Sequence, residues 1–204
     1  MDVVLGRLKS TIALVYLDDI VVFSKDFDEH ISNLAQVFQA LRQAGLKLKP
    51  TKCNFGENEL LFLGHVISKN SITVNPEKIR AVENFPKSQR KRDVMSFLGL
   101  CSYYRRFICN FAKIARPLHK LTENDVKFKW SAEADMAFEI LKNKLISSDV
   151  LAFPDDEAPT QIHCDASGYG LGATLVQIQD GKERVVAYAS RSLKNMRKII
   201  RLRN

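Results

Sequence analysis

The chain has 204 residues, of which 46% are hydrophobic and 26% charged, and its formal net charge is +8. This composition provides enough apolar surface for folded cores and excludes a wholly disordered chain. We expect neither a membrane-spanning segment nor a secretory signal, because apolar runs are short and the N-terminus lacks a cleavage pattern. The four scattered cysteines form no CxxC pair, which favours a reduced intracellular chain in the cytoplasm or nucleus.

Two apolar, β-branched runs fill residues 12–23 and are separated by Leu17, Asp18 and Asp19. This pattern predicts a strand–turn–strand hairpin with carboxylates at its tip. Adjacent negative charges repel, and a divalent ion such as Mg²⁺ relieves the repulsion because it prefers carboxylate oxygens and leaves positions for phosphate. Two such ions can clamp the attacking and leaving oxygens of a phosphoryl displacement. The alternative is a polar, solvated turn, since acids are common there.

A helix is predicted over residues 28–44, where apolar residues recur at helical spacing before Gly45. The spacing assigns its buried face to Ile31, Leu34, Phe38 and Leu41. The alternating residues 46–49 predict a short edge strand, and residues 60–67 with 72–74 predict another small hairpin.

Three helices are predicted next. The first begins at the capping residue Asn75 with proline at its first position, and stops before Pro86. The second begins near Asp93, and its other face and its continuation carry Arg105, Arg106, Lys113 and Arg116. A third helix spans residues 131–146, with apolar residues on one side: Ala134, Ala137, Phe138, Leu141 and Leu145.

The positive charge is concentrated on these helices. Between Lys78 and Lys120 there are 11 basic residues against Glu83 and Asp93, a net charge of +9. A basic block in an otherwise neutral chain indicates a polyanionic partner, most often nucleic acid. A solvated helix face is the alternative.

The amino-acid composition changes after the third helix. Residues 147–160 hold two prolines and four acids, which is typical of a boundary between domains. Three strand-like runs follow at 161–165, 172–179 and 183–190, and the last two are joined by a turn at Asp180 and Gly181.

Several longer motifs resemble those of a known family. The YxDD motif lies within LVYLDDIVVFS (14–24), and it is followed in order by KLKPTKCNF (47–55), FLGHVIS (62–68), FLGLCSYYRRFICNFAKIARPL (97–118), HCDASGYGLGATL (163–175) and AYASRSL (187–193). Over nearly the whole chain, these motifs resemble the Pol polyprotein of gypsy-type LTR retrotransposons, which contains reverse transcriptase and RNase H.

The resemblance implies an α+β architecture. Residues 1–75 correspond to the C-terminal half of a reverse transcriptase palm, 76–120 to a helical thumb, 121–157 to a connection and 158–204 to an incomplete RNase H-like α/β domain. The implied activity is RNA-directed DNA polymerase joined to ribonuclease H, with Mg²⁺ or Mn²⁺ as cofactor. The implied partners are an RNA/DNA template–primer, deoxynucleotides and another Pol subunit or domain.

The resemblance also assigns roles to residues. Asp18 and Asp19 would be the catalytic, metal-binding acids of the polymerase, and Asp165 the first metal-binding acid of the RNase H-like domain. A hairpin that holds the primer end would contain Phe62, Leu63, Gly64 and His65, with ordinary packing as the alternative. The residues assigned to nucleic-acid binding are Arg90, Lys91, Arg92, Tyr103, Arg105, Arg106, Lys113 and Arg116. Tyr103, Tyr104 and Phe107 have the chemistry to stack on bases, but for Tyr104 and Phe107 a core position is favoured.

Several features depart from the family pattern. The last residues, 194–204, do not match it and contain no acid to accompany Asp165, and no segment matches the fingers or the strand with the third polymerase carboxylate. We therefore expect a fragment that lacks both activities in isolation. The alternatives are a non-catalytic nucleic-acid-binding remnant that uses the basic thumb, and a decayed reading frame without a stable product.

Overall fold

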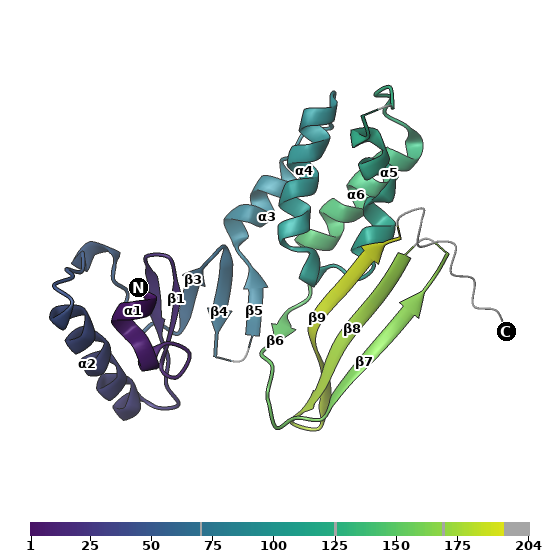
Figure 1. Ribbon diagram of the computed structural model, residues 1–204. Helices are drawn as coiled ribbons and strands as arrows, with labels where there is room; N and C mark the ends of the chain where they lie inside the picture. The colour runs from purple at the N-terminus through teal and green to yellow at the C-terminus, as the bar shows by residue number, and fades with distance from the viewer. Residues whose placement is uncertain (70, 125, 169, 194–204) are drawn as a thin grey trace. The chain divides into compact units, whose positions relative to one another are not determined.

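The computed structural model describes residues 1–69, 71–124, 126–168 and 170–193 (Figure 1). These residues form two compact units, the first spanning Met1–Gly56 and the second beginning at Glu57. Helices and antiparallel strands occur in both units, which confirms the predicted α+β class. Within the described residues, no helix is both long and apolar enough to cross a membrane.

The first unit is built on a two-stranded hairpin. Strand β1 (Ala13–Tyr16) pairs antiparallel with β2 (Asp19–Val22), as the sequence predicts. Helices α1 (Asp2–Leu5) and α2 (Phe27–Gln43) lie in the same unit, together with the 3-10 turns Gly6–Leu8 and Pro50–Lys52. Its core consists of the buried residues Leu5, Ala13, Val37 and Leu41.

The bounds of α2 lie within one residue of the predicted helix, but the predicted buried face is partly wrong. Ile31 and Phe38 are 52% and 37% exposed. The buried side chains are instead Asn33, Val37 and Leu41, one turn apart along a single stripe. The Asn33 side-chain amide donates to the Phe23 carbonyl oxygen at 3.0 Å and so turns this stripe toward the core.

The predicted edge strand at residues 46–49 is wrong. The backbone amide of Leu46 donates to the Leu41 carbonyl oxygen at 2.9 Å, so the chain closes the end of α2 instead of entering a sheet. A strand needs a neighbouring strand for its backbone groups, and alternation alone does not supply one.

The second unit contains a four-stranded antiparallel sheet. Its strands follow the order β3 (Glu59–Phe62), β4 (His65–Ser68), β5 (Ser71–Val74) and β6 (Leu151–Ala152). The apolar run 60–67 is therefore itself a hairpin, so the region holds one strand more than predicted. The boundary at Gly56 lies inside the segment 1–75 assigned to the palm, and β3–β5 belong to the same unit as the helices that follow.

The second unit also contains four helices, which lie together in Figure 1: α3 (Pro76–Glu83), α4 (Lys91–Tyr103), α5 (Phe111–Thr122) and α6 (Ala132–Ile146). The predicted cap at Asn75 is confirmed, because its side-chain oxygen accepts from the amide of Glu77. The Ser131 hydroxyl caps α6 in the same way and accepts from the amide of Ala134. The buried face of α6 also matches the prediction and consists of Ala134, Ala137, Phe138, Leu141 and Leu145.

A second antiparallel sheet completes this unit. Strands β7 (Thr160–Ala166), β8 (Gly170–Gln179) and β9 (Lys182–Ser192) contain all three predicted runs. The Asp180–Gly181 turn is also confirmed, with φ +52° and +72°. The sheet meets the helices where the Ala112 amide, in the first turn of α5, donates to the Ser190 hydroxyl on β9 at 2.9 Å. The segment 194–204, which was predicted to depart from the family pattern, lies outside the described residues.

The structure predicts that the core of the second unit depends on Phe97. This side chain is fully buried, and its ring centroid lies 4.4 Å from that of Phe138. Phe97→Ala should lower the free energy of unfolding of this unit by about 3–5 kcal/mol. Urea titration followed by fluorescence of the single tryptophan, Trp130, measures the effect because that ring packs against Phe138. Met95→Ala is the control, since Met95 is exposed on the same helix; equal losses in both variants would contradict the assignment.

Candidate functional site

The acidic tip of the first hairpin is a tight turn. Tyr16 pairs with Asp19, so Leu17 and Asp18 form a two-residue loop. Leu17 has φ +55° and is 77% exposed. A bulky residue rarely adopts this conformation, which costs roughly 1–2 kcal/mol, and such strain is concentrated at functional sites. The turn therefore fixes the positions of the two carboxylates at some cost in stability.

Asp18 and Asp19 are both exposed, and the structure brings them together as predicted. Among the described residues, neither carboxylate has a hydrogen-bonding or ion-pairing partner, and no three His, Cys, Asp or Glu side chains gather where a metal could bind. The pair fits two oxygen ligands of a hard divalent cation, and further ligands would have to come from substrate, water or residues outside this set.

The second predicted site is the β3–β4 hairpin. Phe62 pairs with His65, and the intervening Leu63 and Gly64 have φ +48° and +72°. Two consecutive left-handed residues are typical of the hairpin turn that matches the twist of its strands. Glycine tolerates this conformation readily, whereas leucine at the first position is strained.

Both carbonyl groups of this turn accept two hydrogen bonds. The Leu63 oxygen accepts from the Tyr103 hydroxyl and from Nδ1 of His65. The Gly64 oxygen accepts from the Tyr104 hydroxyl at 2.8 Å and from the Asn75 amide at 3.2 Å. Since a carbonyl oxygen has two lone pairs, the turn has no acceptor left. The sequence analysis missed this role of the tyrosines, and no local pattern links positions about 40 residues apart.

Aromatic rings enclose the turn. The His65 ring stacks on Phe107 at 5.6 Å, with an interplanar angle of 24°, and lies 5.6 and 5.5 Å from the rings of Tyr103 and Tyr104. Tyr104 and Phe107 are buried, which confirms their predicted core positions. Tyr103 is 54% exposed, so one part of its ring packs on the hairpin and another part stays accessible.

His65 is held in its neutral form. Burial is the main cause that lowers its pKa, and the positive charge of Arg106 lowers it further, against the opposing effect of the hydrogen bond to Leu63. A carbonyl oxygen only accepts, so Nδ1 carries the proton and Nε2 has a lone pair. Nε2 is buried and has no partner among the described residues.

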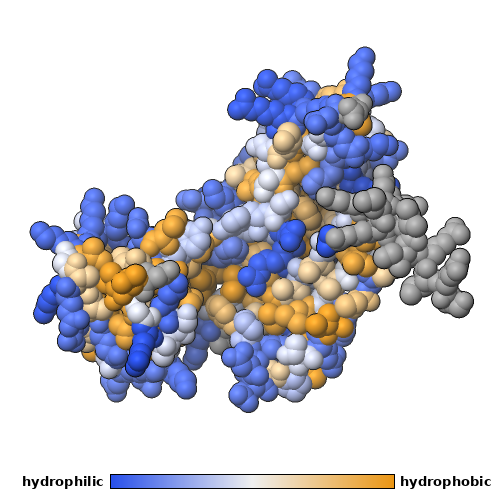
Figure 2. All heavy atoms as spheres, viewed as in Figure 1, coloured by the Kyte–Doolittle hydropathy of each residue, from blue (hydrophilic) through white to orange (hydrophobic). Residues whose placement is uncertain are grey.

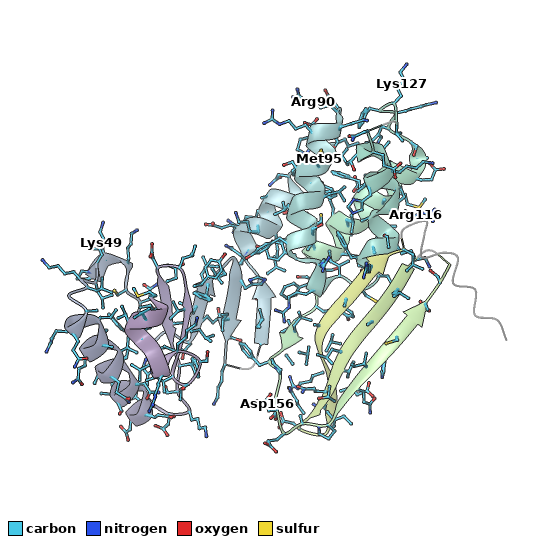
Figure 3. The ribbon with its side chains drawn as sticks, viewed as in Figure 1. Lys49, Arg90, Met95, Arg116, Lys127 and Asp156 are labelled. Carbon is cyan, nitrogen blue, oxygen red and sulfur yellow. The ribbon has the colours of Figure 1, made fainter. Side chains whose placement is uncertain are left out.

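The basic residues predicted to bind nucleic acid lie near both ends of α4 and on α5. Arg90, Lys91 and Arg92 lie at its N-terminal end, where Lys91 Nζ donates to the carbonyl oxygens of Glu123 (2.6 Å) and Asn124 (3.4 Å). Arg105 and Arg106 directly follow its C-terminal end in the 3-10 turn Arg105–Phe107. In Figure 2, hydrophilic residues cover the helices of the second unit at the end that carries Arg90, and Figure 3 labels that side chain pointing outward.

On α5, Lys113 and Arg116 are both exposed. A helix of the length of α4 spans roughly 20 Å, which corresponds to about six phosphates along one strand of a duplex. The structure therefore spreads the predicted basic residues over a surface and uses Lys91 to hold the end of α5.

Asp165 lies exposed on the outer strand β7, directly opposite Gly172 of β8. A Cβ atom at Gly172 would lie 2.9 Å from Oδ1 of Asn110, so glycine leaves room for the side chain that begins α5. The next acids, Asp180 and Glu183, lie at the far end of the sheet, so roughly 23 Å of β8 separates them from Asp165. Neither of these two acids is therefore close to Asp165.

Two family models match the chain, one over its N-terminal half and one over its C-terminal part. A family model described as reverse transcriptase (RNA-dependent DNA polymerase) matches residues 1–102, half of the sequence. The chain belongs to the reverse transcriptase family. A second model, the RNase H-like domain found in reverse transcriptase, matches residues 130–201. The prediction that residues 194–204 do not match the family is therefore wrong for the part up to residue 201.

The relatives of this reverse transcriptase chain are retrotransposon polyproteins. It is 36% identical to the retrovirus-related Pol polyprotein from transposon opus of Drosophila melanogaster, over 95% of this chain and 20% of that protein. It is 33% identical to the polyprotein from transposon gypsy of the same fly, with the same coverage of both chains. The predicted resemblance is confirmed, and the chain spans about a fifth of the length of these relatives.

Solved structures agree with this assignment. The foamy viral protease-reverse transcriptase dRH in complex with double-stranded DNA is 26% identical, with a TM-score of 0.82 over 97% of this chain and 35% of that chain. The same viral protein in complex with an RNA/DNA hybrid gives a TM-score of 0.81 at 26% identity, over 97% of this chain and 27% of that chain.

The β3–β4 turn predicts that alanine substitution costs more stability at Gly64 than at Gly181. Gly64 and Gly181 share φ +72°, but a Cβ atom at Gly64 would lie 3.0 Å from the Tyr104 hydroxyl, whereas Gly181 has nothing within 4 Å. Gly181→Ala should cost about 1–2 kcal/mol from backbone strain alone, and Gly64→Ala should cost more. Urea titration of both variants, followed by Trp130 fluorescence, compares them directly. Equal losses would mean that the tyrosine contact does not constrain the turn.

Proposed function

We propose that this chain supplies part of the palm, the thumb and the start of the RNase H-like domain of an RNA-directed DNA polymerase of the retrotransposon type. The observation that supports this most directly is the pair of exposed carboxylates on a strained hairpin tip. This hairpin lies within the segment that the reverse transcriptase model matches.

The chemistry at the hairpin tip is nucleotidyl transfer. Asp18 and Asp19 offer hard oxygen ligands that suit Mg²⁺ or Mn²⁺, and such ions, when bound, stabilise negative charge on a reacting phosphate. The chain's own contribution is positioning, since β1 and β2 fix both carboxylates on a hairpin that packs in the core of the first unit. Positioning and electrostatics supply most of the rate in phosphoryl transfer.

The substrate we propose is a primer–template duplex with deoxynucleotides. The solved viral relatives are complexes with double-stranded DNA and with an RNA/DNA hybrid. Arg92, Arg105 and Lys113 are exposed on the helices of the second unit, where they can neutralise phosphates without reading sequence. The Leu63–Gly64 turn accepts hydrogen bonds from Tyr103 and Tyr104, which directly precede Arg105, and we propose that this turn holds the primer end.

For the RNase H-like segment, we propose that Asp165 is the first of several metal-binding acids. Its partners would come from beyond the described residues, because Asp180 and Glu183 lie at the far end of the sheet.

The first functional prediction concerns the salt dependence of duplex binding. Arg105→Gln with Arg106→Gln should weaken binding of a primer–template and reduce the slope of log K against log salt by about one unit per lost phosphate contact. Glutamine preserves the stem of Arg106 beside the Phe107 ring. Lys144→Gln with Lys182→Gln is the control, since both lysines are exposed and the net charge changes equally. Fluorescence anisotropy at several salt concentrations measures the slope, and equal effects of both pairs would contradict a specific interface.

The second functional prediction tests catalysis in a complete polymerase. The chain is substituted for the matching segment of an active gypsy-type Pol enzyme, and primer extension is measured with Mg²⁺. Asp18→Asn with Asp19→Asn should lower the rate by about 10²–10³-fold, because charge stabilisation in the transition state is lost. Asp28→Asn, an exposed acid of the same unit, should leave the rate unchanged. Duplex binding with an inactive chimera would favour the non-catalytic nucleic-acid-binding alternative.

A further inference from the structure

The β3–β4 turn and the end of α4 are joined by contacts that go beyond ordinary packing. The hydroxyl groups of Tyr103 and Tyr104 donate hydrogen bonds to the consecutive carbonyl oxygens of Leu63 and Gly64, respectively. These two carbonyls belong to the only residues between β3 and β4, so both carbonyls of the turn accept from one pair of neighbouring side chains, in addition to the bonds from His65 and Asn75.

The same short segment carries charge. Arg105 and Arg106 follow the tyrosines directly and form a 3-10 turn with Phe107. The Arg106 guanidinium carbon lies 6.0 Å from the centroid of the Phe107 ring, and that ring stacks on His65 of the hairpin. These contacts therefore fix the distance between the arginines and the turn, and a duplex bound to the arginines would reach the turn at that distance.

The local geometry of the turn agrees with this arrangement. A Cβ atom at Gly64 would lie 3.0 Å from the Tyr104 hydroxyl, so the hydroxyl occupies the space that a side chain would need. Leu63 is left-handed with φ +48°, a strained conformation that persists when the surroundings over-determine it. Burial raises the pKa of Tyr104 to about 12, so its hydroxyl keeps its proton and remains a donor at neutral pH.

We propose that Tyr103 and Tyr104 are positioning residues that lock the β3–β4 turn to the end of α4 and thereby place a primer 3′ end relative to the basic helices. This inference rests on the proposed function, because it presumes that the chain binds a primer–template. Rigid coupling matters because a pre-organised surface loses less conformational freedom on binding. The two hydroxyls act through the turn and need not touch the nucleic acid.

The test compares two duplexes with the full chain. One has a recessed primer 3′ end, and the other has the same length with both ends closed by nucleotide loops. Tyr103→Phe with Tyr104→Phe removes only the two oxygen atoms and keeps both rings. It should weaken binding to the recessed end about tenfold, the effect of losing two ordinary hydrogen bonds, and leave the affinity for the closed duplex unchanged.

Tyr188→Phe is the matched control. Its hydroxyl donates to the Asp149 carboxylate at 2.8 Å within the same unit, and its pKa is likewise raised to about 12, chiefly by burial. This variant should bind both duplexes as the unsubstituted chain does. Trp130 fluorescence during a thermal melt checks that each variant is folded, and if the double variant unfolds, the single variants should each show about a threefold loss.

The outcomes separate this inference from the function on which it rests. If the unsubstituted chain binds neither duplex, both are overturned. If it binds both duplexes equally, or prefers the recessed end and keeps that preference in the double variant, the positioning role alone is overturned. If both affinities fall together in the double variant, the tyrosines are merely structural and the inference is again overturned.

Discussion

The arrangement of the second unit depends on how the two carbonyl groups of the Leu63–Gly64 turn are satisfied. A two-residue turn in the left-handed region is costly when its first residue is leucine. Buried backbone acceptors also need donors. Both needs are met by Tyr103 and Tyr104, which lie about 40 positions further along the chain. The hairpin and the helices therefore stabilise each other, and neither geometry follows from its own segment.

The core of this unit also joins elements that are distant in the chain. Phe97 and Phe138 bring α4 and α6 together, and Tyr188 of β9 packs against the same cluster. Strand β6, from the predicted connection, pairs with β5 at the edge of the sheet that begins with the β3–β4 hairpin. The segments predicted to be thumb, connection and RNase H-like domain thus contribute side chains to one core. A substitution that disturbs packing in this core therefore affects all three segments.

Charge is used in two different ways in the two units. The basic block has a net charge of +9, yet part of it serves the fold: Lys91 binds the carbonyl oxygens at the end of α5, and Arg90 pairs with Asp93. The net charge therefore overstates the number of cations available to a polyanion. In contrast, Asp18 and Asp19 are exposed without a partner among the described residues, as expected for groups whose counter-charge arrives with a ligand.

The sequence by itself determined the features that depend on near neighbours. The β-branched runs around Asp18 and Asp19 gave the acid-tipped hairpin, the Asn75 cap gave the start of α3, and the long motifs gave the family. Only the tertiary structure decided which stripe of α2 is buried, which strand pairs with β5 and which tyrosine hydroxyls reach the Leu63–Gly64 turn. The physical reason is that local spacing sets backbone conformation and periodicity. The choice among possible contacts depends instead on partners that are distant in the chain and are brought together only when the core forms.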